Sequence, residues 1–485
     1  MAPQNAAIES FFQQRPTNTS LACEPGEGFT QEEIESVLHP QVDNTWTPDA
    51  PYEHVDIDEL DAGPRCVLIT GRIVNFYNQP ATQKRPQSAK GCLRLLVKDD
   101  TGVMTVRLWY SHMEYKLQLG QIVSIWTPHV SNGDHGSLAV PQAPMFVSIF
   151  PERDRSCHFK IHESGDQGLQ YKKPLEYCEG NALPELMTLK NFAEGGYEVP
   201  NSRVLVCVKG VGAKRKVATK KGGDVNDLVK VMVFDDTTEA TFSLWGPMTA
   251  SAANWKASHT VLLLTRPGYN PGKSVWLSLK NHTIVDIDPA ISDAFWLRAF
   301  AQRMIKKSHV NPTIPAGVFD FDSFLASDTK MLFTFADIDY IARLDDAEPI
   351  VGYLSVVIYE IFLTKLHRRN MLLGNECCGI PIYANAIAGK CKHCDKEVPL
   401  RVNPRILGTV MDETGCSATG KMILSHQAWE HLLGRSAAEL ASASSELIEY
   451  LEQRLLFLRV TLLFGWAVED NESGIGRLCI EDVRM

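Results

Sequence analysis

The sequence predicts a mainly β protein built from three small barrels in tandem, the third of which carries a metal-binding insert and helices. Three observations lead to this prediction. Residues 99–109 and 235–245 have the same residue at six of eleven positions, and residues 411–415 form a weaker third copy. Short apolar runs with strand-like alternation surround each copy. Four cysteines cluster between residues 377 and 394, after the start of the third region.

Each copy follows an apolar run and begins with an acidic, Thr- or Gly-containing segment, which predicts strand, tight turn and strand. Alternation along the second strand puts Trp109 and Trp245 on its polar face, which is typical of a ligand-facing surface. The paired aspartates of these turns, with Asp100 and Asp236 as the test positions, also resemble the metal-binding pair of a nuclease. Their place in a turn explains them better, so we expect no enzyme.

Length and composition describe a globular protein with room for about three domains. No apolar stretch reaches the ~18 residues of a membrane span, and the N-terminus lacks the pattern of a secretory signal. Most of the twelve cysteines are scattered, which favours a reducing compartment over a disulfide framework.

The net charge of −10 is unevenly distributed. Residues 1–60 contain twelve acidic residues and one basic residue, Arg15, which gives −11. The other 425 residues therefore sum to −10 − (−11) = +1, so the folded part is compatible with an anionic partner. The acidic head is also rich in Pro and Gln, and we expect it to be mostly disordered.

One short motif in the head resembles the box that binds a sliding clamp, with Ile8 followed by Phe11 and Phe12. The box has Gln where this chain has Asn5. The alternative interpretation is a short amphipathic contact with another protein or with this one.

The predicted organisation is an acidic head at 1–60 and a first barrel at 61–165, then a second barrel with a trailing helix at 185–307 and a third barrel at 345–485. Residues 151–200 are expected to be mostly linker with a short helix or two. Helices are predicted at residues 291–307, 426–440 and 446–453, and the last two strands at residues 455–464 and 476–483.

The cysteine cluster predicts a structural zinc site. Cys391 and Cys394 form a C-x₂-C pair, and Cys377 and Cys378 lie upstream, so two short knuckles could supply four thiolates. Adjacent cysteines point apart in an extended chain, so one of Cys377 and Cys378 could be replaced by His393 or by His367. The alternative is a set of free buried cysteines.

Binding to single-stranded DNA needs cationic side chains for phosphates and aromatic rings for bases. The second barrel has a run of basic residues near its tryptophan, and the first barrel has a similar set. An ordinary solvated loop or a nuclear import signal is the alternative for the basic run, and core packing is the alternative for a strand tryptophan. The candidate contact residues are Phe76, Lys84, Arg85, Lys90, Arg94, Arg107 and Trp109 in the first barrel, Lys214, Arg215, Lys216, Lys220, Lys221, Trp245, Arg266, Tyr269 and Lys273 in the second, and Lys390, Lys392, Lys396, Arg401 and Arg405 in the third.

Over residues 60–485 the chain resembles the large subunit of replication protein A, across its three DNA-binding OB-folds. The resemblance rests on Leu244-Trp245-Gly246, on residues 288–298 after the second barrel, and on residues 432–440 after the third acidic turn. It implies that Trp245 and Tyr269 occupy base-stacking positions, and that the third barrel carries zinc. Leu93 stands where the family has a stacking Phe.

The chain departs from the family in three ways. The N-terminal protein-docking domain is replaced by the acidic head, and the first two cysteines of the zinc knuckle are adjacent rather than separated by four residues. The sequence stops at Met485, so trimerisation through a C-terminal helix is not expected. This trimmed layout is similar to that of shieldin subunit 2 and of the meiosis-specific OB-fold relative of replication protein A.

The sequence therefore predicts a nuclear, non-enzymatic protein that binds single-stranded DNA in repair, recombination or replication. Zinc is the expected cofactor, and a sliding clamp or another repair protein is an expected partner of the head; no membrane is expected. The rival hypothesis is an OB-fold scaffold that holds protein partners in a complex that protects DNA ends.

Overall fold

The computed structural model describes residues 46–78, 86, 88–132, 143–162, 168–218, 225–272, 275–306, 311–344, 348–417, 419–468 and 476–485. Residue contacts divide the chain into Met1–Pro48 and Asp49–Met485, and every described helix and strand lies in the second unit. None of the described helices is long and apolar enough to cross a bilayer. The clamp-like motif of the head lies outside the described residues.

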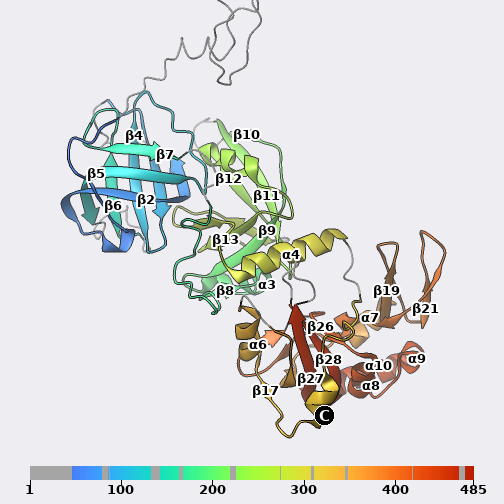
Figure 1. The fold of residues 1–485 in the computed structure, drawn as a ribbon. Coiled ribbons are helices and arrows are strands. Elements are labelled where there is room, and N and C mark those ends of the chain that lie inside the picture. Colours follow the sequence, from blue (N-terminus) through green and yellow to red (C-terminus); the bar gives the residue numbers. More distant parts are fainter. Residues whose placement is uncertain are drawn as a thin grey trace, which may run out of the picture. The chain divides into compact units, whose positions relative to one another are not determined.

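The first sheet closes into a barrel (Figure 1). Its strand order is β1-β2-β3-β4-β6-β5-β7, and β2 also pairs with β5. The long strand β2 bends at a register shift between Ile73 and Asn75, and this lets it pair with β5 along its first part and β3 along its second. The strands are β1 (Glu53–His54), β2 (Gly63–Asn78), β3 (Gly91–Lys98), β4 (Val103–Tyr110), β5 (Ile122–Asn132), β6 (Met145–Ile149) and β7 (His158–Ile161), with the 3-10 helix η1 (Ile57–Glu59) before β2.

The second sheet repeats this plan in the order β14-β15-β12-β11-β9-β13-β16. Helix α4 covers one side of it, because Ile291, Ala294, Leu297 and Ala301 recur at helical spacing and pack on β9 and β13. The elements are β8 (Leu186–Met187), α3 (Leu189–Ala193), η2 (Gly196–Glu198), β9 (Arg203–Val211), β10 (Arg215–Ala218), β11 (Val225–Phe234), β12 (Glu239–Trp245), η3 (Gly246–Asn254), β13 (Val261–Thr265), β14 (Gly268–Asn270), β15 (Val275–Ser278), β16 (Ile284–Ile287) and α4 (Ser292–Lys306).

The third sheet has the order β25-β24-β18-β27-β28-β26, and two small sheets that carry the cysteines are inserted between β18 and β24. Its elements are α5 (Phe321–Ala326), β17 (Leu332–Phe333), α6 (Phe335–Ala342), β18 (Ile350–Ile358), α7 (Leu363–Arg368), β24 (Val410–Met411), β25 (Cys416–Ser417), β26 (Met422–Leu424), α8 (His426–Leu433), α9 (Ala437–Ala441), α10 (Ser445–Leu455), β27 (Arg459–Val468) and β28 (Gly476–Arg484). The insert contains β19 (Leu373–Cys377), β20 (Ile380–Ala384), β21 (Ala388–Lys390), β22 (Glu397–Pro399), β23 (Arg401–Val402) and η4 (Pro404–Ile406).

All three sheets share one strand topology. In each, the first barrel strand pairs with the second and the fourth, and the third pairs in parallel with the fifth. The parallel pairs are β4 with β6, β12 with β15, and β26 with β28. This is the order of the OB-fold, a five-stranded Greek-key barrel. The predicted fold class is confirmed.

The repeated acidic turn has the same structural role in every barrel. The first aspartate of each turn accepts hydrogen bonds from two backbone N–H groups of its own turn through Oδ1. Its Oδ2 accepts one from the first residue of the short helix that precedes the barrel, at 2.7–2.8 Å. The three pairs are Asp99 with Ile57, Asp235 with Leu189, and Asp412 with Phe335.

The threonine two positions further on completes this arrangement. Its hydroxyl donates to the same carboxylate and accepts from the next N–H of the helix, as Thr101 does with Asp58 N. A carboxylate at a helix start satisfies N–H groups that have no partner within the helix. The turn therefore fastens each preceding segment to its barrel, which agrees with the structural interpretation of these aspartates.

The first two barrels are joined by a buried ion pair. Lys98, at the end of β3, is completely buried, and its Nζ lies 2.8 Å from Asp286 Oδ1 on β16. The same Nζ donates to Lys173 O at 2.6 Å. Asn75 of β2 adds hydrogen bonds from Nδ2 to Lys280 O and Thr283 O. A buried charge is costly unless it is paired and hydrogen-bonded. The burial of Lys98 therefore depends on Asp286 and Lys173 O staying at these positions.

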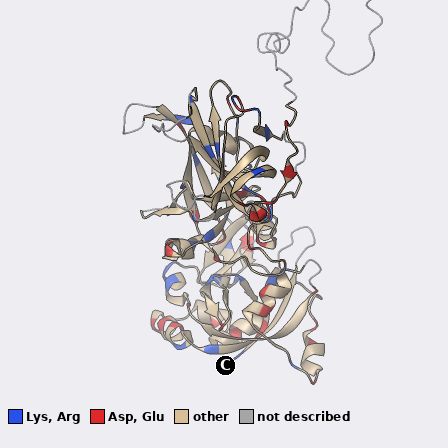
Figure 2. Cartoon of the chain, turned by 90° about the vertical axis from the view of Figure 1, so that its left-hand side faces the viewer, with Lys and Arg blue, Asp and Glu red and all other residues tan. Residues whose placement is uncertain are grey.

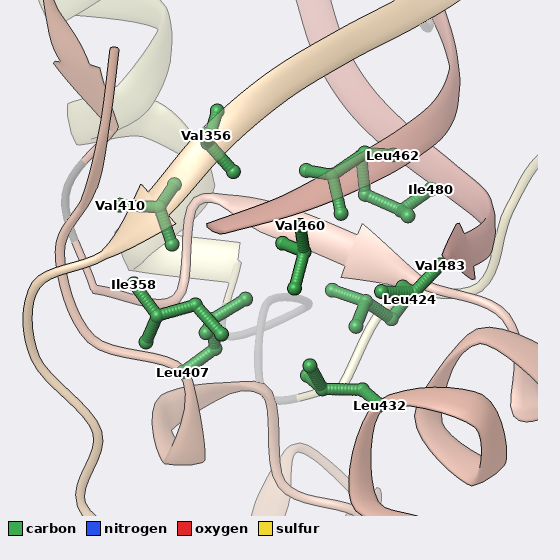
Figure 3. Close-up of a pocket in the computed structure, with 10 residues that line it drawn as sticks. All are labelled: Val356, Ile358, Leu407, Val410, Leu424, Leu432, Val460, Leu462, Ile480 and Val483. Carbon is green, nitrogen blue, oxygen red and sulfur yellow. The ribbon is translucent and has the colours of Figure 1, made fainter. Parts of the chain in front are cut away.

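The interior of the third barrel is apolar throughout. Figure 3 shows ten aliphatic side chains from its strands, from Leu407 and from helix α8 pointing toward one another around a small enclosed cavity. Val356, Val460 and Ile480 are among the most buried of them. Because no polar group lines this cavity, it belongs to the core and not to a binding site.

Three element boundaries differ from the prediction. The single helix expected at 426–440 is two, because Gly434 adopts a left-handed φ of 62° and ends α8, and Ser436 then caps α9. Helix α10 extends to Leu455, so the next strand begins at Arg459 rather than at residue 455. The expected linker at 151–200 contains β7, β8 and α3. Strand β7 pairs with β5 and strand β8 pairs with β9, and these pairings depend on tertiary structure.

Candidate nucleic-acid interface and metal centre

The outward side chains of β11, β12 and β15 form one surface, called here the outer face of the second barrel. Along β11 the exposed residues Lys230 and Met232 alternate with the buried Val229, Val231 and Val233. Lys230 pairs with Ser243 in register, and Thr241 pairs with Trp276, so these side chains lie on the same face. The complete face consists of Leu228, Lys230, Met232, Thr241, Ser243, Trp245 and Trp276.

Trp245 is the exposed aromatic residue of this face. It ends β12, and half of its side chain, 50 %, is accessible to solvent. Gly246 follows with a left-handed φ of 56°, which turns the chain into η3 without covering the indole. An indole held open on a sheet surface offers a flat surface on which a base can stack.

A second aromatic group of the outer face is paired with a cation. The Nζ of Lys230 lies 5.1 Å from the ring centroid of Trp276, within the range of a cation–π contact. Sequence reasoning missed both residues. Trp276 is adjacent to Trp245's strand only because β15 returns parallel to β12, a pairing that no local pattern reveals.

The basic segment lies at the edge of the same sheet. Arg215 and Lys216 are exposed on β10, where Arg215 pairs with Leu228 of the outer face. Lys214 precedes them, and its Nζ lies 2.8 Å from Asp227 Oδ2, so part of its charge is neutralised. Lys220 and Lys221 lie outside the described residues.

Tyr269 is a half-buried member of an aromatic stack. Its ring lies 4.8 Å from that of Tyr197 at an interplanar angle of 25°, and it meets Phe192 edge-on. Tyr197, whose exposed fraction is 42 %, is the more accessible ring and was not identified from the sequence. Arg266 adopts a left-handed φ of 56° and lies near His282, whose pKa is lowered by burial and then by Arg266. Lys273 lies outside the described residues.

The first barrel uses the same strand positions differently. Arg94, Arg107 and Phe146 stand where the second barrel has Lys230, Ser243 and Trp276 relative to the acidic turn. The guanidinium of Arg107 lies 5.3 Å from the ring centroid of Phe146. Both barrels therefore place a cation over an aromatic ring on the outer face.

Two predicted aromatic contacts of the first barrel are corrected by the structure. The expected outward Trp109 is only 7 % exposed, because Ala89, Cys92 and Phe150 cover it and its Nε1 donates to Ser148 Oγ. Phe76 has no exposed surface, since β2 turns it into the barrel core. Neither ring can stack on a base in this conformation. Lys90 is exposed, and Lys84 and Arg85 lie outside the described residues.

Charged residues of both signs are interspersed along the part of the chain that the structure describes (Figure 2). In the third barrel, Lys392 and Lys396 are exposed near the cysteines, whereas Lys390 pairs with Asp395 at 3.2 Å. Arg401 donates to Asn311 O, and Arg405 is exposed. An interface would therefore depend on local combinations of cation and ring.

The four predicted cysteines come together in the insert of the third barrel. The sulfurs of Cys377, Cys378, Cys391 and Cys394 all lie within 4.8 Å of one another. Cys377 Sγ lies 3.8 Å from Cys378 Sγ and 3.6 Å from Cys394 Sγ. Thiolates on a tetrahedral zinc ion, with Zn–S bonds of about 2.3 Å, would lie about 3.8 Å apart. The donor set and its spacing fit a metal ion.

A left-handed turn brings the adjacent cysteines to the same site. Cys378 has a φ of 53° and Gly379 one of 66°, so the chain is not extended there and the two thiols do not point apart. Backbone N–H groups of Cys394 and His393 lower the pKa of Cys391 to about 7. Donation of this kind favours the thiolate, which is the form that binds metal. The group of possible metal ligands that the described residues bring together here consists of the four cysteines.

Comparison with known proteins identifies no family for this chain. No protein-family model and no curated protein sequence matches the chain. A replication protein A heterotrimer bound to single-stranded DNA matches 88 % of this chain and 95 % of its own, at 14 % identity and a TM-score of 0.35. The replication factor A related protein of Methanobacterium thermoautotrophicum covers 22 % of this chain and 94 % of its own, at 18 % identity and a TM-score of 0.17.

A HIN domain in complex with duplex DNA covers 47 % of this chain and 100 % of its own, at 12 % identity and a TM-score of 0.19. The assignment of the OB-fold rests on the strand order described above, which is the same in all three sheets.

Proposed function

We propose that this chain binds single-stranded DNA through the outer faces of its first two barrels. The observation that carries the proposal is the second outer face, where the exposed Trp245, the Lys230–Trp276 pair and the adjoining Arg215 lie on one sheet. Rings stack on bases, and basic side chains release counterions from phosphates. A mixed array of this kind serves a flexible single strand, whose bases are free to stack.

The wider setting follows from the resemblance to the replication protein A large subunit. We place the protein in the nucleus, in repair, recombination or replication, without catalysis of its own. The aspartates that a nuclease would need already have other partners. Asp235 Oδ2 accepts a hydrogen bond from Leu189 N, and Asp236 forms an ion pair with Lys421 at 2.6 Å. The clamp-binding role of the head remains part of this proposal.

The direct test is fluorescence anisotropy of a labelled single strand of about 30 nucleotides with the full chain, across a salt series and with duplex competitor. We expect salt-dependent binding that prefers the single strand. Trp245→Ala should weaken binding by about 1–3 kcal/mol, the usual value of one stacked base. Phe295→Ala is the matched control, because this exposed ring lies on α4 and outside both outer faces.

Equal loss in both variants, or a normal affinity of Trp245→Ala in a folded protein, would remove the stacking role of Trp245. Absence of any binding at low salt would favour the scaffold hypothesis instead.

For the cysteine cluster we propose a structural zinc ion held by Cys377, Cys378, Cys391 and Cys394. Zinc would link the end of β19, the turn before β20 and the segment between β21 and β22, because the four cysteines lie on these segments. Elemental analysis should find about one zinc per chain, lost in Cys391→Ser. Retention of a full equivalent in that variant would show that the metal is bound elsewhere.

A further inference from the structure

Two arginines face each other on the outer face of the first barrel. Arg94 on β3 and Arg107 on β4 are direct partners across the antiparallel pair, so their side chains leave the sheet on the same side. Like charges placed opposite each other lower the stability of a sheet. The matching positions of the second barrel hold one cation only, with Lys230 opposite the neutral Ser243.

These arginines are also substantially buried. Arg94 is 8 % exposed, and Arg107 is half-buried. The Nε of Arg107 is buried and has no hydrogen-bond partner among the described residues. A buried cation with an unused donor is costly unless an acceptor of opposite charge reaches it.

Among the described residues, the titratable groups that act on Arg107 are Arg94, Cys92 and Tyr77, and none of them is a carboxylate. Burial lowers the pKa of Arg107 most, and the adjacent Arg94 lowers it further, while Cys92 and Tyr77 oppose this. Burial raises the pKa of the Cys92 thiol to about 11 and that of Tyr77 above its usual value, so both are neutral at pH 7. Tyr77 is hydrogen-bonded to Arg94, and Phe146 lies against the guanidinium of Arg107.

We propose that Arg94 and Arg107 form an oxyanion subsite on the first barrel, and that its ligand is a phosphodiester group of a single DNA strand. This proposal rests on the proposed function and assigns the first barrel its own part in it. Each guanidinium group carries a fork of N–H donors that matches phosphate oxygens, and the ligand would give the Nε of Arg107 an acceptor, which it lacks among the described residues.

Binding by charge variants of the full chain provides the first test. Arg107→Gln and Arg94→Gln should each weaken the single strand by about tenfold, the size expected for a charged hydrogen bond. Arg107→Lys, which keeps the charge and loses the fork, should fall between wild type and Arg107→Gln. Lys160→Gln on β7 removes one exposed positive charge from a different strand and should change affinity little. An equal effect of Arg107→Gln and Lys160→Gln would overturn the proposal.

Thermal unfolding without nucleic acid separates a ligand site from a structural pair. The double variant Arg94→Met, Arg107→Met should unfold at a higher temperature than the wild type, because it removes the repulsion and the buried unpaired donor. Inorganic tripolyphosphate should raise the unfolding temperature of the wild type and have little effect on the double variant. A double variant that is less stable, or equally stabilised by tripolyphosphate, would refute the subsite.

The two proposals can fail separately. A strand that binds tightly and with the same affinity to the arginine variants would leave the proposed function intact and remove the subsite. Arginine-dependent stabilisation by tripolyphosphate without strand binding would refute both the DNA-binding function and the phosphodiester ligand, and would assign the two arginines to a free polyphosphate.

Discussion

The first and second barrels have the same strand register around the acidic turn, but the side chains on their outer faces differ in type and in exposure. In the second barrel Trp245, which follows the acidic turn, is half exposed. On the outer face of this barrel Lys230 of β11 lies opposite the neutral Ser243 of β12. In the first barrel the matching Trp109 is covered by Phe150 and Ala89, and the matching positions hold two arginines. The second barrel thus exposes an aromatic ring at this position, whereas the first barrel places two cationic side chains opposite each other. These are the features on which the proposed base contact and the proposed phosphate contact rest.

The comparison shows that the copies of this motif share the residues of the acidic turn more strictly than the residues of the outer faces. Asp99, Asp235 and Asp412 all cap the helix in front of their barrels with the same hydrogen bonds. The side chains on the outer faces differ at most positions. The turn therefore has the same structural role in each barrel, and the outer faces are where the proposed functions of the barrels differ.

The two tryptophans give the sharpest test of this comparison. Trp109→Ala should lower the free energy of unfolding by about 3–5 kcal/mol, the usual cost of deleting a buried Trp side chain. Trp245→Ala should leave stability nearly unchanged, because its ring is half exposed. Denaturant unfolding of both variants measures the difference. Similar losses of stability would mean that the two indoles are equally buried in solution.

The equivalence of the acidic turns can be broken next. Asp235→Ala removes the acceptor for Leu189 N and for two N–H groups of the turn, and should cost about 2 kcal/mol of stability. Glu194→Ala removes an exposed carboxylate of the same charge at the end of α3, and is the control. Asp99→Ala should match Asp235→Ala if the turns are equivalent, and unequal costs would show that they are not.

The third turn predicts a pH dependence. Burial alone would raise the pKa of Asp412, but hydrogen bonds from Phe335, Thr414 and Gly415 lower it below its usual value. A carboxylate with a lowered folded pKa stabilises the fold above its unfolded pKa, and that stability is lost as pH falls through the folded value. Unfolding between pH 7 and pH 3 should therefore show a smaller acid loss in Asp412→Asn. An unchanged pH profile would contradict this role.

The smallest expected effect concerns the basic edge of the second barrel. Replacing Lys214, Arg215 and Lys216 by Gln should mainly flatten the dependence of log Kd on log salt, because exposed cations contribute through counterion release. Lys214 should contribute least, since Asp227 already pairs with it. An unchanged salt slope would mean that these three residues make no phosphate contacts, and would leave the first barrel as the proposed site of those contacts.

Much of this protein could be derived from the sequence by itself. Alternating apolar runs and repeated turns defined a mainly β chain of three barrels, because a strand with one buried face must alternate. The C-x₂-C pair with two cysteines upstream identified the four thiols that the fold brings together. Trp245 was recognised because it follows the turn at a position whose alternation is visible locally.

Only the tertiary structure decided what covers each side chain and which strands meet. The sequence pattern placed Trp109 and Trp245 alike, yet Phe150 and Ala89 cover the first, whereas the second is half exposed. The parallel return of β6 and β15 put Phe146 and Trp276 beside cations far away in the chain. The left-handed Cys378 let two adjacent thiols meet. The alternation of residues along a strand specifies only the face of the sheet on which a side chain lies. Its solvent exposure and its contacts depend on which other segments pack against that face.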